Sequence, residues 1–218
     1  NTASGGNGGG IAVFGAALEM DSCSILNNTA KNGAGVYIEV DADDVKKAVI
    51  KNSFIENNIT NNGQGGGLYS KAKIYLINSS ISYNESVDDY GAGIYNSSAG
   101  EINIIESTIQ GNTTNTKGGA IHSEGTLYVS RSRVVDNYAG DTAGGFRICC
   151  GMNAEVYNTT IAGNHSGNGF ANGFELAGGQ GNLVLKNSIL WNDGVNEISF
   201  DESSEPWSLD IEYSTIKN

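Results

Sequence analysis

The stretch LINSSISYN (residues 76–84) returns along the chain in variants such as AVIKNSFIENN (48–58) and VYNTTIAGN (156–164). When the copies are aligned on Ser79, apolar residues stand five and three positions before the serine and two positions after it. The last of these columns reads Ile25, Ile55, Ile81, Ile109, Val134, Ile161, Leu190 and Ile216. Successive members lie 25–30 residues apart, a period typical of stacked supersecondary units.

Apolar residues within each copy alternate with a period of two and are rich in β-branched types, which predicts strands rather than helices. The positions before the serine have the opposite parity to the serine position and the residue two places after it. All of them can face one interior only if the chain bends just before the serine. Asparagine, which tolerates the left-handed conformation of such a bend, stands there in Asn52, Asn78, Asn158 and Asn187.

These features predict an all-β fold, a single-stranded right-handed parallel β-helix (solenoid) of about eight coils with three short strands per coil. Like residues would stack from coil to coil about 4.8 Å apart. The serine column and the asparagines five positions after it would form hydrogen bonds along the axis; Asp193 takes the last place in that asparagine column. Residues 1–218 form one domain, and the opening NTASGGNGGG, without an initiator Met or a signal peptide, indicates a segment of a longer chain.

The net charge of −12 argues against nucleic-acid binding, which needs clustered cationic residues, and against docking on anionic membranes. No run of eighteen apolar residues is present, so we expect no membrane insertion. The charge fits calcium, and Asp41, Asp43 and Asp44 in the longest turn are candidate ligands. A charged turn that keeps a strand edge soluble is the alternative, and no other cofactor is expected.

A glycine motif lies between successive copies, as in GGGI (8–11), GAGV (33–36) and GGGL (65–68). The strand after each glycine motif carries a column of outward positions. Its members are Ala12, Tyr37, Tyr69, Tyr95, His122, Arg147 and Glu175. The three tyrosines and His122 would form a flat aromatic strip that can stack on sugar rings or contact a partner. Plain cross-strand packing of the rings is the alternative. No second His or Cys lies near His122 in the sequence, so we do not expect it to bind a metal.

Arg131, Arg133 and Arg147 form the best cationic cluster, which a polysaccharide lyase would need to bind a substrate carboxylate. A solvated basic patch is the alternative. Cys23 lies about five coils from Cys149 and Cys150, too far for a disulfide, so it should be a free, buried thiol. Cys149 and Cys150 form either a vicinal disulfide or two reduced thiols, one pointing inward and one outward.

GGAI (118–121) and FIEN (54–57) resemble the repeats of the chlamydial polymorphic membrane proteins. LKNSILWNDGVNEIS (185–199) resembles the end of β-helix regions in bacterial secreted "choice-of-anchor" proteins. The resemblance implies a right-handed parallel β-helix and an extracellular or cell-surface location.

Two functional hypotheses follow. The first is a non-catalytic secreted or cell-surface β-helix that acts as a rigid stalk, adhesin or filament-building unit. It would contact a glycan or a surface protein along one face and could associate with itself end to end, because uncapped coils leave open strand edges. The alternative is a polysaccharide lyase or hydrolase that acts on acidic glycans.

Overall fold

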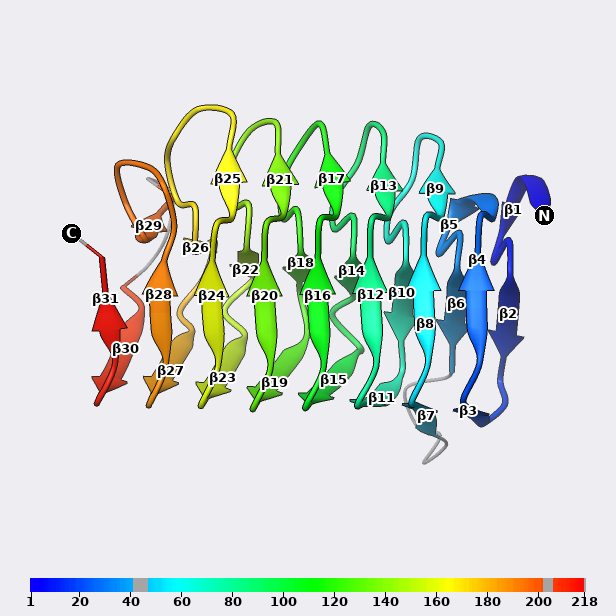
Figure 1. The fold of residues 1–218 in the computed structure, drawn as a ribbon, viewed down its shortest axis with the longest axis horizontal. Helices are drawn as coiled ribbons and strands as arrows, with labels where there is room; N and C mark the ends of the chain where they lie inside the picture. Colours follow the sequence, from blue (N-terminus) through cyan, green and yellow to red (C-terminus); the bar gives the residue numbers. More distant parts are fainter. Residues whose placement is uncertain (41–46, 202–205, 218) are drawn as a thin grey trace.

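A computed structural model describes residues 1–40, 47–201 and 206–217 as a parallel β-solenoid (Figure 1). Strands of like position in successive coils pair in parallel, so the predicted all-β fold is confirmed. The chain rises along the front of Figure 1, crosses to the back at the top and descends there, while it advances from right to left. This winding is right-handed. The structure contains four sheets where the sequence predicted three strands per coil, because a further short strand follows the asparagine column.

Sheet B holds the strands that follow the glycine motifs. It contains β2 (Ile11–Phe14), β6 (Val36–Glu39), β10 (Leu68–Lys71), β14 (Ile94–Asn96), β18 (Ile121–Ser123), β22 (Phe146–Cys149), β26 (Phe174–Ala177) and β29 (Ile198–Phe200). Sheet C holds the strands that precede the bend. It contains β3 (Leu18–Asp21), β7 (Lys47–Lys51), β11 (Lys73–Ile77), β15 (Glu101–Ile105), β19 (Thr126–Ser130), β23 (Asn153–Tyr157), β27 (Asn182–Lys186) and β30 (Ser208–Glu212).

Sheet D follows the bend and faces the viewer in Figure 1. It contains β4 (Ser24–Leu26), β8 (Phe54–Glu56), β12 (Ser80–Ser82), β16 (Thr108–Gln110), β20 (Arg133–Val135), β24 (Thr160–Ala162), β28 (Ile189–Trp191) and β31 (Thr215–Ile216). The short strands of sheet A complete the coils. They are β1 (Thr2–Asn7), β5 (Thr29–Asn32), β9 (Ile59–Thr60), β13 (Glu85–Ser86), β17 (Thr113–Thr114), β21 (Tyr138–Ala139) and β25 (His165–Ser166).

The apolar columns stack in register inside the solenoid, as predicted. Ile81 pairs with Ile55 of the preceding coil and with Ile109 of the following one, and all three side chains are fully buried. The two columns in sheet C align in the same way, for example Leu76 with Ile50. Each buried side chain therefore lies on its equivalents, and burial of such aliphatic side chains is the main favourable term in folding.

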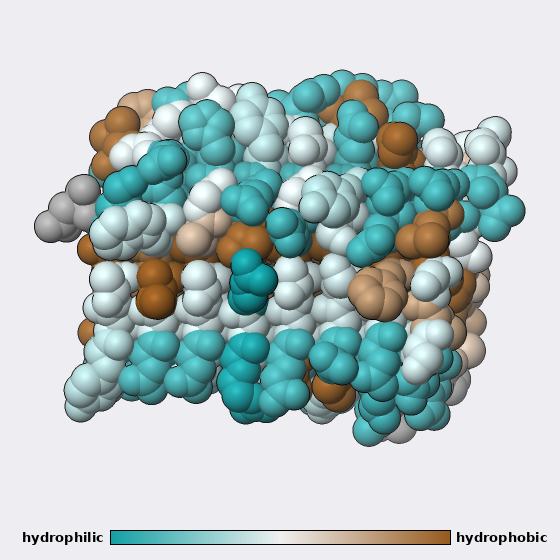
Figure 2. All heavy atoms as spheres, viewed as in Figure 1, coloured by the Kyte–Doolittle hydropathy of each residue, from teal (hydrophilic) through white to brown (hydrophobic). Residues whose placement is uncertain are grey.

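The bend between sheets C and D is a left-handed residue in every coil, at the position directly before the serine column. These residues have φ between 46° and 55° and are Ser22, Asn52, Asn78, Glu106, Arg131, Asn158, Asn187 and Tyr213. The bend reverses the parity of the chain, so the residues on both sides of it face the same core. In Figure 2 the lower edge of the front face, where the chain turns from sheet C into sheet D, is largely hydrophilic.

The serine column links the coils through the backbone. The N–H of Ser53 donates to Oγ of Ser79, and the N–H of Ser79 donates to Oγ of Ser107, each at 3.1 Å. Each hydroxyl in turn donates to the carbonyl two residues before it, as Ser79 does to Ile77 at 2.8 Å. Thus the buried hydroxyls and amides of this bend are paired, as buried polar groups need to be.

The asparagine column forms a second buried ladder. The backbone N–H and the Nδ2 group of Asn58 both donate to Oδ1 of Asn84, at 3.0 and 2.9 Å. Asn84 repeats this pattern with Asn112 and also donates from Nδ2 to the carbonyl of Ile55. Since each asparagine ties three coils together, this column satisfies the turn and fixes the spacing of the coils.

The last asparagine of the ladder is Asn192, so the assignment of Asp193 to this column was wrong. Asn164 donates to Oδ1 of Asn192 from its backbone N–H at 2.8 Å and from Nδ2 at 2.9 Å. Gly163, with φ of 65°, separates Asn164 from the strand before it, whereas Asn192 follows β28 directly. The seventh coil therefore lacks one residue of the turn, and this shifts the alignment by one.

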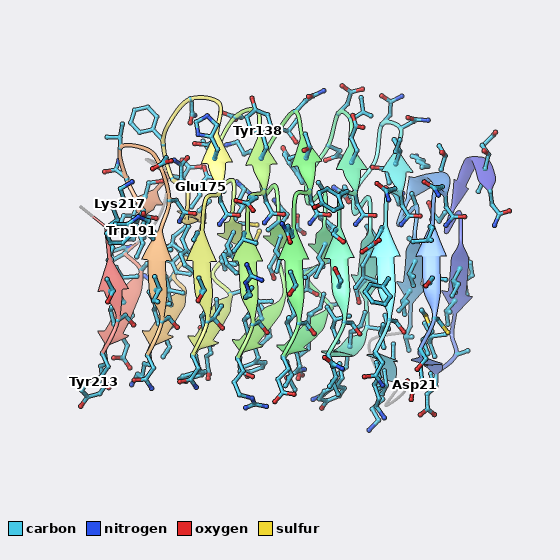
Figure 3. All side chains as sticks on the ribbon, viewed as in Figure 1. Asp21, Tyr138, Glu175, Trp191, Tyr213 and Lys217 are labelled. Atoms are coloured by element: carbon cyan, nitrogen blue, oxygen red, sulfur yellow. The ribbon has the colours of Figure 1, made fainter. Side chains whose placement is uncertain are left out.

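The final coil leaves part of its apolar columns exposed. Leu209 and Ile211 are 40% and 36% exposed, although their equivalents in the second to seventh coils are buried. At the same end Trp191 and Lys217 lie side by side (Figure 3), with Nζ of Lys217 5.8 Å from the indole centroid and 2.6 Å from Asp193. Among the described residues there is no helix that could cross a lipid bilayer.

Candidate functional site

The predicted aromatic strip lies on the outer side of sheet B, but it is covered. The rings of Tyr37 and Tyr69 stack with centroids 4.8 Å apart, those of Tyr69 and Tyr95 at 5.1 Å, and those of Tyr95 and His122 at 5.2 Å. Their exposed fractions are only 3%, 8%, 5% and 1%. The four rings thus form the predicted strip, stacked nearly parallel. The structure shows cross-strand packing, the second of the two arrangements considered, and the buried rings are not available to stack on a sugar.

Tyr90, from the turn before β14, helps to bury this column. It packs against the tyrosine cluster and stacks on His122 with the ring centroids 4.7 Å apart. His122 thus contacts two parallel rings, Tyr90 and Tyr95, which fix the orientation of the imidazole. Its Nδ1 atom is buried and has no hydrogen-bond partner among the described residues.

Nε2 of His122 is surrounded by functional groups from two coils. Glu124 Oε1 lies 3.6 Å from it, Cys149 Sγ 3.9 Å and Arg147 Nη1 3.5 Å. The hydroxyl of Tyr95 donates to Glu124 Oε1 at 2.7 Å. The expectation that no Cys lies near His122 was therefore wrong.

The register of sheet B explains this cluster. Ser123 of β18 pairs with Ile148 of β22 in the next coil. This register places Cys149, which follows Ile148, beside Glu124, which follows Ser123. Glu124 is two residues after His122 and so lies on the same side of the sheet. The positions two residues after the tyrosine column form a second outward column. Alignment of this column would have revealed Glu124 and Cys149 in the sequence.

Burial dominates the electrostatics of the cluster. It lowers the pKa of His122, and it raises the pKa of the Cys149 thiol to about 12 with a further contribution from the hydrogen bond to Cys150. The pKa of Glu124 is lowered, mainly by its interaction with His122 and also by the hydrogen bond from Tyr95. At neutral pH the cluster thus contains a neutral imidazole, a thiol and a carboxylate.

This arrangement differs from a nucleophile relay. In such a relay the nucleophile contacts one imidazole nitrogen and the carboxylate orients the other. Here Cys149 and Glu124 approach the same nitrogen, while no residue in the described part of the chain pairs with Nδ1. The raised pKa of Cys149 also opposes formation of a nucleophilic thiolate.

The predicted arginine cluster is not assembled. Arg131 lies at the bend and forms an exposed ion pair with Glu106 at 2.8 Å, and Arg133 is exposed on sheet D. Arg147 lies on sheet B, behind sheet D in Figure 1, and pairs with the buried carboxylate of Glu175 at 2.9 Å. These arginines therefore cannot act on one substrate carboxylate.

A groove of about 670 Å³ opens beside Glu175, toward the C-terminal end of sheet B. Two half-exposed aromatic residues, Phe170 and Phe200, form part of its wall. The polar residues that line it are Lys117, Thr142, Asn168, Glu175, Asn196, Ser199 and Asp201. Glu175, labelled in Figure 3, accepts a hydrogen bond from Thr142 at 2.7 Å and lies 3.6 Å from Lys117. The groove thus combines apolar ring faces with hydrogen-bonding groups.

The remaining candidate residues have simple outcomes. Cys23 is a free thiol, as predicted, but is half-buried rather than buried. Cys149 and Cys150 are also free thiols, one buried and one exposed. Cys149, like Arg147, lies on the outer side of sheet B. The buried thiol is therefore covered by neighbouring side chains on that side and does not point into the core. Asp41, Asp43 and Asp44 lie outside the described residues.

Comparison of the chain with protein-family models, with curated proteins and with solved structures found no match in any of the three. The geometry of the solenoid and its surface are therefore the basis for a functional proposal.

Proposed function

We propose that this protein is a non-catalytic, secreted or cell-surface β-helix that acts as a rigid stalk or adhesin and binds a glycan in the groove beside Glu175. The groove carries the proposal, because two exposed aromatic rings and several polar side chains meet there. The location is supported by the resemblance of the repeats to those of secreted and surface proteins.

The lining of the groove matches the chemistry of a sugar. Phe170 and Phe200 are 52% and 50% exposed, and such rings can stack on the apolar face of a pyranose. Asn168, Asn196 and Ser199 offer both donors and acceptors for hydroxyl groups. The carboxylates nearby and the net charge of −12 favour a neutral or cationic glycan over an acidic one.

Two observations support a binding role over catalysis. The carboxylate of Glu175 is engaged by Arg147, Thr142 and Lys117, so it is held as an ion-pair partner rather than as a free base. The arginines that a lyase would use lie on different sides of the solenoid. The continuous serine and asparagine ladders stiffen the coils, as a stalk requires.

A glycan array with neutral, amino-sugar and acidic oligosaccharides tests this function. We expect binding to neutral or amino-sugar ligands, and we expect Phe170→Ala and Phe200→Ala each to weaken it about tenfold, since an aromatic contact contributes roughly 0.5–1.5 kcal/mol. Phe54→Ala is the matched control, because Phe54 is equally exposed but lies on sheet D.

Two results would overturn the proposal. One is binding to a surface protein without any glycan binding. This result would be compatible with the stalk role but would contradict the glycan site in the groove. The other is release of unsaturated products from an acidic polysaccharide, followed by ultraviolet absorbance, with loss of turnover in Arg147→Ala; it would identify a lyase.

A further inference from the structure

The cluster around His122 has the geometry of a chelate. Nε2 of His122, a carboxylate oxygen of Glu124 and Sγ of Cys149 all lie within 4.8 Å of one another. The closest pairs are 3.6 Å for His122 and Glu124 and 3.9 Å for His122 and Cys149. In a tetrahedral zinc site, ligand atoms of these types are roughly 3.4–3.6 Å apart. The two pairs that include His122 therefore lie within a few tenths of an ångström of this spacing, and the third pair, Glu124 and Cys149, lies within 4.8 Å.

We propose that His122, Glu124 and Cys149 form a binding site for a divalent transition-metal ion of the zinc type. One nitrogen, one sulfur and one oxygen ligand suit zinc or cobalt rather than calcium or magnesium, which require oxygen ligands. Three protein ligands leave a fourth position for water or a small ligand. This site is separate from the groove beside Glu175 and does not depend on the proposed glycan binding.

The surrounding residues hold the ligands in place before an ion binds. Tyr90 and Tyr95 stack on the imidazole, and the hydroxyl of Tyr95 donates to Glu124 Oε1 at 2.7 Å. His122 is 1% exposed and its Nδ1 has no hydrogen-bond partner among the described residues. Among the same residues its Nε2 makes only long contacts, 3.5 Å to Arg147, 3.6 Å to Glu124 and 3.9 Å to Cys149. Coordination through Nε2 would provide a reason for burying a polar ring here.

The guanidinium of Arg147 contacts the imidazole of His122 and must move away when the metal binds. Its Nη1 lies 3.5 Å from Nε2 of His122, but its Nε is held by Glu175 at 2.9 Å. Rotation of the guanidinium about this ion pair would remove Nη1 from Nε2 while Glu175 keeps the charge balanced. Cys149 would release its proton to solvent as the thiolate forms, so binding is coupled to the loss of one proton.

Titration of the purified, reduced protein with Co²⁺ tests the site, because a thiolate ligand produces a sulfur-to-cobalt charge-transfer band. We expect this band in the parent protein, its loss in Cys149→Ser, and its displacement by added Zn²⁺. Cys23→Ser and Cys150→Ser are the matched controls and should keep the band. Tyr95→Phe removes the hydrogen bond to Glu124 and should weaken Co²⁺ binding by roughly 10–100-fold.

Absence of the band from the reduced parent protein would overturn the assignment. Retention of the band in Cys149→Ser would also overturn the assignment, because the sulfur ligand would then be another cysteine. Circular dichroism of each variant establishes that the solenoid is still folded when the band is measured.

Discussion

Asn192 donates its backbone N–H to Oε1 of Glu197 at 2.6 Å and its Nδ2 group to Oε2 at 2.7 Å. A carboxylate from the turn after β28 thus takes the place that the next asparagine would fill. The ladder of buried amides, in which each rung needs an acceptor on the following coil, is closed at this end by an acidic side chain that is itself 9% exposed.

Glu197→Gln should destabilise the protein by about 1–3 kcal/mol, because an amide NH₂ would face one of the two buried donors of Asn192. Urea unfolding followed by circular dichroism measures this change. The control Glu85→Gln alters an exposed glutamate of β13 and should change the free energy of unfolding by less than about 0.5 kcal/mol. Equal effects of the two substitutions would show that Glu197 does not terminate the ladder.

A rung in the middle of the ladder should matter still more. Asn84→Ala leaves both donors of Asn58 without an acceptor and frees the carbonyl of Ile55. We expect a loss of about 2–4 kcal/mol in the free energy of unfolding. Asn153→Ala, at an exposed position in β23, should be nearly neutral in the same denaturation experiment. A small effect at Asn84 would contradict the role of the column in joining the coils.

The bend can be tested at Asn78, whose φ is 46°. Asn78→Gly and Asn78→Val both remove the side-chain hydrogen bond to Asn52, so their difference isolates the backbone conformation. The valine variant should be less stable than the glycine variant by about 1–2 kcal/mol, because a β-branched residue opposes the left-handed conformation. Equal stabilities of the two variants, from midpoints and slopes in urea, would contradict this account of the bend.

Alkaline pH should weaken the fold through the buried thiol of Cys149. Its pKa in the folded protein is raised to about 12, so the native state holds this proton more tightly than the unfolded chain does. The resulting stabilisation is complete below the ordinary thiol pKa of about 8.5 and is lost as the pH rises toward 12. The buried hydroxyl of Tyr95, whose pKa is also raised, acts in the same direction.

Urea denaturation at about pH 8 and about pH 10.5 measures this dependence. Cys149→Ser replaces the thiol by a hydroxyl that does not titrate in this range, so the variant should lose less stability between the two pH values than the parent protein. An identical loss in both proteins would show that Cys149 does not contribute to the alkaline dependence.

Much of the fold is predictable from the sequence, since the packing of one coil on the next makes each column visible as a repeated residue type. Ile55, Ile81 and Ile109 could be placed over one another because all three occupy the same position in the repeat. Asn192 could not be placed, because the seventh turn lacks one residue and the letters then suggest Asp193. Register in a solenoid depends on the local turn as well as on the period.

The candidate sites were less predictable than the core. The burial of Tyr69 and Tyr95 depends on Tyr90, which comes from a turn whose length varies between coils, and alternation along a strand says nothing about such a cover. The contact between His122 and Cys149 follows from the repeat, but Cys149 belongs to a second outward column, two residues after the column that contains His122. The groove between Phe170 and Phe200 arises from irregular turns at the last coils, where the pattern is weakest.

Because the strands run across the long axis of the solenoid, the hydrogen bonds between coils point along it. A pulling force applied to the two ends would therefore load these bonds directly and peel the coils off one after another. From Ile81 to its partner Ile109 a coil contains 28 residues, which at roughly 3.4 Å per residue is about 95 Å of extended chain. Under tension the molecule would lengthen in discrete steps of this order, each of which dissipates mechanical work.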